Sequence, residues 1–324
     1  MRPADSYHGQ PVLKPPVWSD EIPCYFFTGG LAGASAGLGY LSGLRGNGAL
    51  ARRAWGIAML GIGASPPLLI AGLGRPLRFL NMLRMVKVTS PMSVGSWILT
   101  ASGATTTLAA VNAWTGRFPR TARLARPAAA VFGLPLCTYT AALIADTAVP
   151  VWHRAHRLLP VVYGSGAALS AGGAAVAVTP PADAAPARRL AIGAALIEVG
   201  AKELMHHRLG ERGEPYKQGA AARFGHVSRA CSLGGAALLY RWGPGSRPAA
   251  IAAGALLCAG ALSARLSTFR AGYQSAADPT YVVGPQRAGI ERGDRPGAAR
   301  REATVRDPEP ARGSPASAPV ELPA

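Results

Sequence analysis

The feature that most limits how this chain can fold is a series of apolar segments, each about twenty residues long. A run of about twenty apolar residues is the length at which an α-helix crosses the hydrocarbon core of a bilayer. We therefore expect an all-α integral membrane protein with eight transmembrane helices. The expected helices cover about residues 22–44, 53–73, 93–114, 127–149, 158–178, 188–206, 221–240 and 248–268.

The chain carries a net charge of +18, which in a soluble domain would suggest a nucleic-acid partner. Residues 1–268 hold 26 Lys and Arg against 9 Asp and Glu, and the basic residues gather at the ends of the apolar runs. Basic residues at those positions contact lipid headgroups and influence the topology of membrane helices. We therefore expect the basic residues to contact membrane lipid, and we expect no nucleic-acid partner.

Two polar segments flank the apolar runs. Residues 1–21 form a Pro-rich arm, and residues 270–324 combine Pro, Gly, Ala, Arg and Glu with few large apolar residues, which is typical of a disordered tail. The membrane domain is expected between them, at residues 22–269. Its four cysteines are isolated and its histidines form no evident mid-membrane pair, so we expect no metal site, haem or covalently bound cofactor.

A long basic connector, residues 73–97, separates the second and third apolar runs. Basic and apolar residues alternate within it at helical spacing, a pattern that suits a short helix lying at a membrane surface. The basic residues are Arg75, Arg78, Arg84 and Lys87. A plain connector would be shorter, so the segment is interpreted either as an interfacial anchor or as a surface with a further use.

Two polar residues of the fourth apolar run are candidates for proton chemistry. Tyr139 and Asp146 are seven residues apart, and two helical turns would place them on one face. A phenol and a carboxylate there could hydrogen-bond a quinone carbonyl and transfer its proton. The alternative is a tyrosine at the membrane interface and a carboxylate at a helix end, paired with a nearby arginine.

The sixth apolar run contains a polar stripe, because Glu198, Lys202 and His206 recur at intervals of four. The stripe is interpreted either as part of a proton path, with Glu203 included, or as a structural ladder in which Glu198 pairs with Lys202. Arg229, in the seventh run, is expected to need an acidic partner. The candidates for that partner are Asp146, Glu198 and Glu203.

Four segments together resemble the NrfD-like membrane subunits of polysulfide, nitrite and related molybdenum oxidoreductases. They read WSDEIPCYFFTGGLAG, LGRPLRFLNML, TSPMSVGSW and YTAALIADTAVPVWH, and the likeness covers about residues 7–270. The resemblance implies eight helices arranged as two four-helix bundles without a redox centre of their own. It also implies a subunit that exchanges electrons between membrane quinone and a ferredoxin-like iron-sulfur subunit, which in turn serves a molybdopterin catalytic subunit.

The same resemblance implies where quinone binds. The implied pocket lies near the start of the first helix and the tyrosine of the fourth, which correspond here to residues 18–25 and Tyr139. Menaquinone or another quinone is then expected as an exchangeable substrate, with Glu21, Tyr25, Tyr139 and Asp146 in quinone binding and proton transfer. The basic connector becomes a candidate docking surface for the iron-sulfur partner, and the expected location is the plasma membrane.

Two other functions remain open from the sequence. Prolines 66 and 67 inside the second apolar run, together with the Gly-rich runs, would suit the broken helices of a small-solute transporter. A structural anchor without a quinone site would have the same apolar pattern. The resemblance favours the quinone-linked subunit over both.

Overall fold

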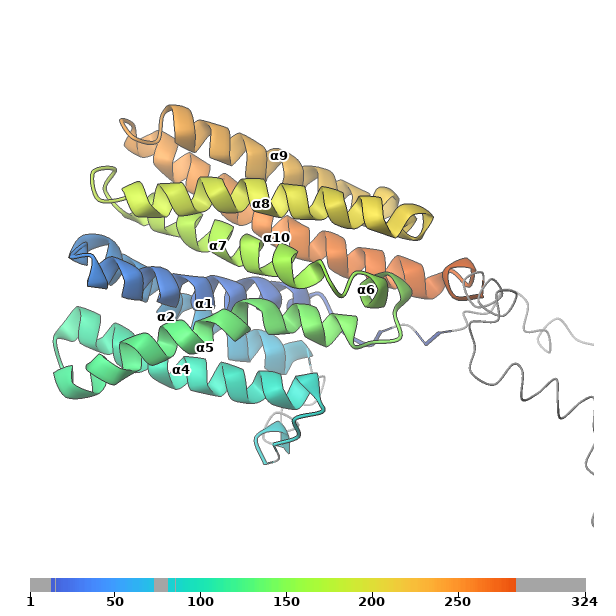
Figure 1. Cartoon of the computed structure of the whole chain (residues 1–324), viewed down its shortest axis with the longest axis horizontal. Helices are drawn as coiled ribbons and strands as arrows, with labels where there is room; N and C mark the ends of the chain where they lie inside the picture. The colour runs from blue at the N-terminus through green and yellow to red at the C-terminus, as the bar shows by residue number, and fades with distance from the viewer. Residues whose placement is uncertain (1–12, 15, 73–80, 85, 284–324) are drawn as a thin grey trace, which may run out of the picture. The chain divides into compact units, whose positions relative to one another are not determined.

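The computed structural model describes residues 13–14, 16–72, 81–84 and 86–283, and all regular structure in these ranges is helical (Figure 1). Besides the two helical residues at 81–82, these ranges contain eight long helices and two short ones, in chain order. They are α1 (Glu21–Leu44), α2 (Gly48–Gly72), α4 (Pro91–Thr115), α5 (Pro119–Ala145), α6 (Pro150–Arg154), α7 (Leu159–Val178), α8 (Ala185–Leu209), the 3-10 helix η2 (Gly210–Lys217), α9 (Gly219–Arg241) and α10 (Arg247–Ala277). Residues 280–283, also helical, belong to a separate unit that begins at Thr280.

Serine and proline mark the starts of two of the long helices. Ser90 accepts a hydrogen bond from the backbone N–H of Ser93, and Pro91 occupies the first turn of α4. Ser246 accepts in the same way from Ala249 at the start of α10. A hydroxyl at the N-cap satisfies one of the free amides of the first turn, and proline has no amide to leave unpaired there.

The long helices form two groups of four (Figure 1). Helices α1, α2, α4 and α5 pack together, and α7 to α10 form the second group, as the resemblance implies. Each group contains a close crossing at facing glycines, which are Gly33 and Gly133 in the first and Gly173 and Gly254 in the second. A β-carbon at any of these positions would meet the backbone or a side chain of the facing helix, so the crossings depend on glycine.

Helix α1 joins the two groups, because it also contacts α7 and α10. Phe26 of α1 packs against Tyr163 of α7 with 6.0 Å between ring centroids. Both rings are buried in the largest apolar core, which also includes Trp152 of α6 and Phe269 of α10. The core is therefore shared between the two bundles at the end where α1 begins.

Five helices of the described part of the chain are long and apolar enough to cross a membrane, namely α2, α4, α5, α7 and α10. Large apolar side chains on helix surfaces are exposed, including Leu60 of α2 and Leu134 of α5. Helices α1, α8 and α9 have comparable lengths, but α1 is rich in Gly and Ser while α8 and α9 carry charged residues. An all-α membrane protein is thus confirmed, whereas eight membrane-crossing helices remain a prediction.

The last long helix corrects the expected boundary of the tail. Helix α10 continues to Ala277 instead of ending near residue 268. Its final turns are helical because they pack: Gly272 leaves room for the ring of Trp152, and Tyr273 contacts both Trp152 and Phe269. From residue 284 onward the expected disordered tail lies outside the described residues.

Candidate functional site

A small cavity lies where the start of α1 meets the end of α2, the start of α4 and the end of α5. Its volume is about 40 Å³. Trp18, Tyr25, Ser96 and Tyr139 are the lining residues with a polar group in the side chain, and the other lining residues are apolar. Residues from the segments WSDEIPCYFF, TSPMSVGSW and YTAALIADT therefore line one space although they are far apart in the sequence.

The position of Tyr139 in this cavity is set by Gly95. A β-carbon on Gly95 would stand 2.8 Å from Cδ2 and 3.1 Å from Cζ of the Tyr139 ring, closer than such carbons approach one another in proteins. Only glycine at this position lets the ring lie against the backbone of α4. The glycine of TSPMSVGSW and the tyrosine of the fourth long helix thus form one packed unit.

The chain before α1 is held at the cavity by α6 and α10. The Trp18 ring stacks on Trp152, with ring centroids 5.9 Å apart and an angle of 18° between the planes. The Tyr273 hydroxyl donates a hydrogen bond to the Trp18 carbonyl, and an Arg270 nitrogen lies 2.6 Å from Asp20 Oδ2. The second bundle therefore positions a residue that lines a cavity of the first.

The structure brings together two of the four residues predicted for quinone binding and leaves two outside. Tyr25, which is buried, and Tyr139 both line the cavity. Glu21 and Asp146 are exposed and do not line it. Asp146 is the C-cap of α5 and is exposed, whereas Tyr139 is half-buried and lines the cavity, so the structure does not bring the two side chains together in this cavity.

The lining of the cavity suits a flat, mostly apolar group with hydrogen-bond acceptors at its edge. Phenol hydroxyls can donate to a carbonyl oxygen, while the apolar walls contact a ring. The Ser96 hydroxyl already donates to the Met92 carbonyl at 2.9 Å, so its oxygen remains an acceptor. The cavity is narrow for a ring, but Met82 and Met92 line it, and methionine side chains rearrange easily.

The polar stripe on α8 is organised as paired charges. Lys202 Nζ lies 3.6 Å from Glu198 Oε1 and donates to Ser228 Oγ at 2.7 Å, and the Ser232 hydroxyl donates to Glu198 Oε2 at 3.2 Å. The Glu198 side chain is fully buried. These contacts match the predicted ladder, in which Glu198 and Lys202 neutralise each other between α8 and α9.

Arg265 of α10 is a buried cation that the sequence reasoning missed. Its Nη2 donates to the Tyr163 carbonyl at 2.6 Å, and its Cζ lies 4.0 Å from the centroid of the Tyr163 ring. A β-carbon on Gly166 would stand 3.0 Å from Arg265 Nη1 and 3.1 Å from Glu198 Oε1. The guanidinium and the carboxylate therefore both pack against Gly166. The sequence did carry a signal for it: a charged side chain inside a membrane helix is costly, so a lone arginine within an apolar run indicates a specific role.

Arg229, in contrast, is half-exposed and pairs with Glu203 across α8 and α9. Of the three acidic partners considered for Arg229, the structure selects this one. The pair borders a polar cavity of about 420 Å³ between α8, α9 and α10, which also contains His206 and Lys202. The His206 ring lies 4.9 Å from that of Tyr216, and burial raises the pKa of the Tyr216 phenol, which stays neutral.

The basic connector is described only in part. Arg84 and Lys87 are exposed, while Arg75 and Arg78 lie outside the described residues. The four cysteines are free, and among the described residues no group of three His, Cys, Asp or Glu side chains is arranged to hold a metal ion.

Comparison with known proteins identifies the family. No curated protein matches the chain. A family described as polysulfide reductase, of the NrfD type, matches residues 14–277, which include both bundles and the cavity. The predicted resemblance is thereby confirmed. This chain belongs to the NrfD-like polysulfide reductase family and is a multi-pass membrane protein of a family of redox-complex subunits.

Proposed function

We propose that this protein is the membrane anchor and quinone-reacting subunit of a multi-subunit oxidoreductase. The observation that carries the proposal is the cavity at the start of α1, which both Tyr25 and Tyr139 line. A quinol oxidised there would release two electrons and two protons. The electrons would pass to an iron-sulfur subunit and then to a molybdopterin subunit, and quinone reduction would run the same steps backwards.

Each tyrosine has a defined part in this proposal. The Tyr25 and Tyr139 hydroxyls hydrogen-bond the quinone oxygens and hold the ring within the cavity. Glu21 and Asp146 are close in sequence to residues of the cavity wall. Ile22, which follows Glu21, and Leu143, three residues before Asp146, both line the cavity. The two carboxylates are exposed to water, and we propose that they exchange protons between the quinone site and water.

The iron-sulfur partner is proposed to dock on the basic connector. Met82, within the connector, lines the cavity, so a partner bound there would approach the quinone closely. Arg84 and Lys87 are exposed and can pair with acidic side chains of a partner, and Arg75 and Arg78 add two charges in the same segment. Such charge complementarity favours correct encounter of subunits more than it adds affinity.

The contacts of Glu198 support a structural role for the α8 stripe over a proton path. Glu198 does not line the 420 Å³ polar cavity, although Lys202 and His206 do. A proton entering from this cavity would therefore have to pass Lys202, whose ammonium is already held by Glu198 and Ser228. We propose that this stripe mainly joins α8 to α9.

The broken helix that would suit a transporter is not observed at the two prolines, because α2 runs without interruption from Gly48 to Gly72. The remaining alternative is an anchor that binds no quinone. The test is quinone-linked electron transfer by the purified complex carrying Tyr139→Phe together with Asp146→Asn.

We expect this double variant to lose about tenfold or more in activity, since a lost hydrogen bond to a reacting oxygen and a lost proton carrier both act on the same step. Tyr240→Phe is the matched control, because this tyrosine is exposed on α9. Unchanged activity of the double variant would rule out the proposed site.

A further inference from the structure

A third cavity, larger than the two described above, lies between the two bundles, on the surface where α1 and α5 face α7 and α8. Its volume is about 690 Å³, and its lining is mainly Gly, Ala and Leu. Leu134 is 70% exposed, and a β-carbon on Gly37 would meet no atom within 4 Å. The cavity is thus an open, apolar groove on the outer surface of a membrane protein.

Two arginines stand at one end of this groove. Arg45 directly follows α1, and Arg189 lies in the first turns of α8. Both side chains are exposed, and within the described residues neither forms an ion pair. Asn47 beside them is already engaged, because its amide donates to the Asp183 carbonyl at 2.8 Å and its oxygen accepts from the Leu50 amide at 3.0 Å.

Other arginines at this end are committed to the protein itself. Arg126 donates to Asn112 Oδ1 at 2.7 Å, and Arg247 donates to three carbonyls at the end of α7. Arg45 and Arg189 differ from these two because their guanidinium groups remain available beside the groove. A guanidinium binds phosphate oxygens with two parallel hydrogen bonds, so two of them form a suitable site for a phosphate diester.

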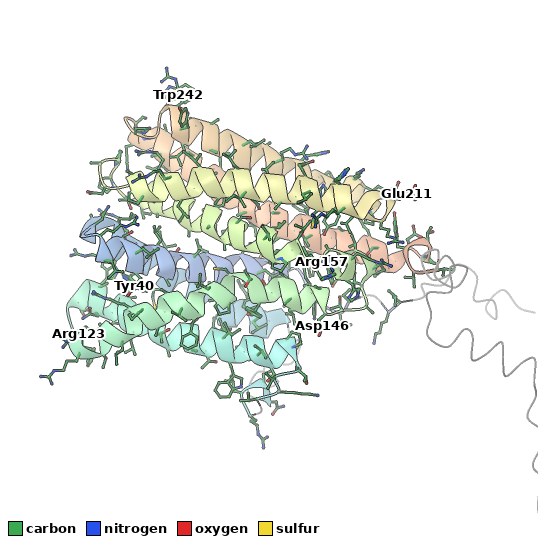
Figure 2. All side chains as sticks on the ribbon, viewed as in Figure 1. Tyr40, Arg123, Asp146, Arg157, Glu211 and Trp242 are labelled. Atoms are coloured by element: carbon green, nitrogen blue, oxygen red, sulfur yellow. The ribbon has the colours of Figure 1, made fainter. Side chains whose placement is uncertain are left out.

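The charge of the surrounding surface favours an anion. Figure 2 shows Tyr40 and Arg123 at one end of the helices and Asp146 and Glu211 at the other. The connections at the Arg123 end and the helix turns beside them, residues 45–53, 117–126, 179–189 and 241–247, hold eleven arginines, and Asp183 is the one carboxylate in these described ranges. An excess of arginine of this size attracts anionic lipids.

The length of the groove matches one leaflet of a bilayer. Helix α1 and its C-cap contribute lining residues from Gly33 to Arg45, a rise of about 18 Å at the usual helical spacing. One leaflet of the hydrocarbon core is about 15 Å thick. We infer that the groove between the bundles binds an anionic phospholipid, with its phosphate at Arg45 and Arg189 and an acyl chain along the small residues of α1.

The test is native mass spectrometry of the full chain reconstituted in bilayers of phosphatidylcholine and phosphatidylglycerol in equal parts. We expect phosphatidylglycerol to be retained preferentially by the wild-type protein. Arg45→Gln combined with Arg189→Gln should lower the affinity about 30-fold, the loss expected for two basic contacts with an anionic lipid. Gly37→Leu, which fills open space in the groove, should also release the lipid without changing the charge.

The matched control is Arg120→Gln with Arg123→Gln, which removes the same charge from exposed arginines at the same end but outside the groove. The control should retain the lipid. Equal loss in the control would mean general attraction to the surface and would overturn the site. Retention of phosphatidylcholine or a quinone in place of phosphatidylglycerol would also overturn the lipid site. This outcome is independent of the Tyr139 variants, which test the quinone site.

Discussion

The ring of Tyr139 on α5 lies in the space that a side chain on Gly95 of α4 would occupy. This contact joins two of the four segments that carry the family resemblance, TSPMSVGSW and YTAALIADTAVPVWH, and it fixes the phenol in the wall of the cavity. The glycine is therefore part of the site even though it has no side chain to offer a ligand.

Replacing that glycine should disturb the cavity without touching a polar group. Gly95→Ala forces the Tyr139 ring to move, and we expect a loss of stability of about 1–3 kcal/mol, typical of overpacking, with lower quinone-linked activity. Thermal unfolding and turnover of the purified complex measure the two effects. Gly63→Ala is the control, since its β-carbon would meet nothing within 4 Å. Wild-type behaviour of Gly95→Ala would contradict the packing described here.

Trp152 is expected to be the residue on which the junction between the bundles depends most. Its side chain is fully buried, its Nε1 donates to the Thr268 carbonyl at 2.7 Å, and it stacks on Trp18. Trp152→Ala should destabilise the protein by about 3–5 kcal/mol, whereas Trp242→Ala, which removes an exposed ring, should cost less than about 1 kcal/mol. Unfolding in mixed micelles compares the two; similar losses would argue against the junction.

Arg265 and Glu198 should be energetically coupled. Both groups are buried against Gly166, and each partly offsets the cost of burying the other. A double-mutant cycle with Arg265→Gln and Glu198→Gln should give a coupling free energy of about 0.5–3 kcal/mol.

The half-exposed pair Arg229 and Glu203 provides the comparison for this cycle. The same substitutions there should give less than about 1 kcal/mol, because water screens exposed charges. Additive effects at Arg265 and Glu198 would show that the two charges do not interact. If quinone-linked proton uptake were lost in Glu198→Gln while the fold was retained, the α8 stripe would be a proton path after all.

The basic connector should control assembly with the iron-sulfur subunit. Arg84→Glu with Lys87→Glu reverses two exposed charges, and we expect the partner to be lost during purification at moderate salt. Arg120→Glu with Arg123→Glu makes the same change at the opposite end and should leave the complex intact. Co-purification of the partner with the first variant at every salt concentration would mean that the connector is only a lipid anchor.

Hydropathy located all eight long helices but misplaced several ends. Helix α5 begins at Pro119 instead of near residue 127, and α2 begins at Gly48 instead of near residue 53. The early turns contain arginines, which interrupt an apolar run but not a helix, because long basic side chains extend toward water. Apolar runs therefore locate the middle of a membrane helix better than they locate its ends.

The candidate site was predictable only in part. The family motifs pointed to Tyr25 and Tyr139, but helical periodicity could not show that Asp146, the exposed C-cap of α5, lies outside the cavity lining. The contact between Gly95 and Tyr139 joins residues 44 positions apart, and no local pattern encodes it. Arg265 had a visible signal in the sequence, whereas its placement against Tyr163 depends on how α10 packs against α7 within the second bundle.

The most direct test of the quinone site is photolabelling of the purified complex with a photoreactive menaquinone analogue, followed by peptide mapping. The cavity predicts saturable labelling on the first turns of α1 and on α5 around Tyr139, reduced by excess menaquinone and by Gly95→Ala. Labelling confined to other helices, or labelling that excess menaquinone does not reduce, would contradict a quinone site at the start of α1.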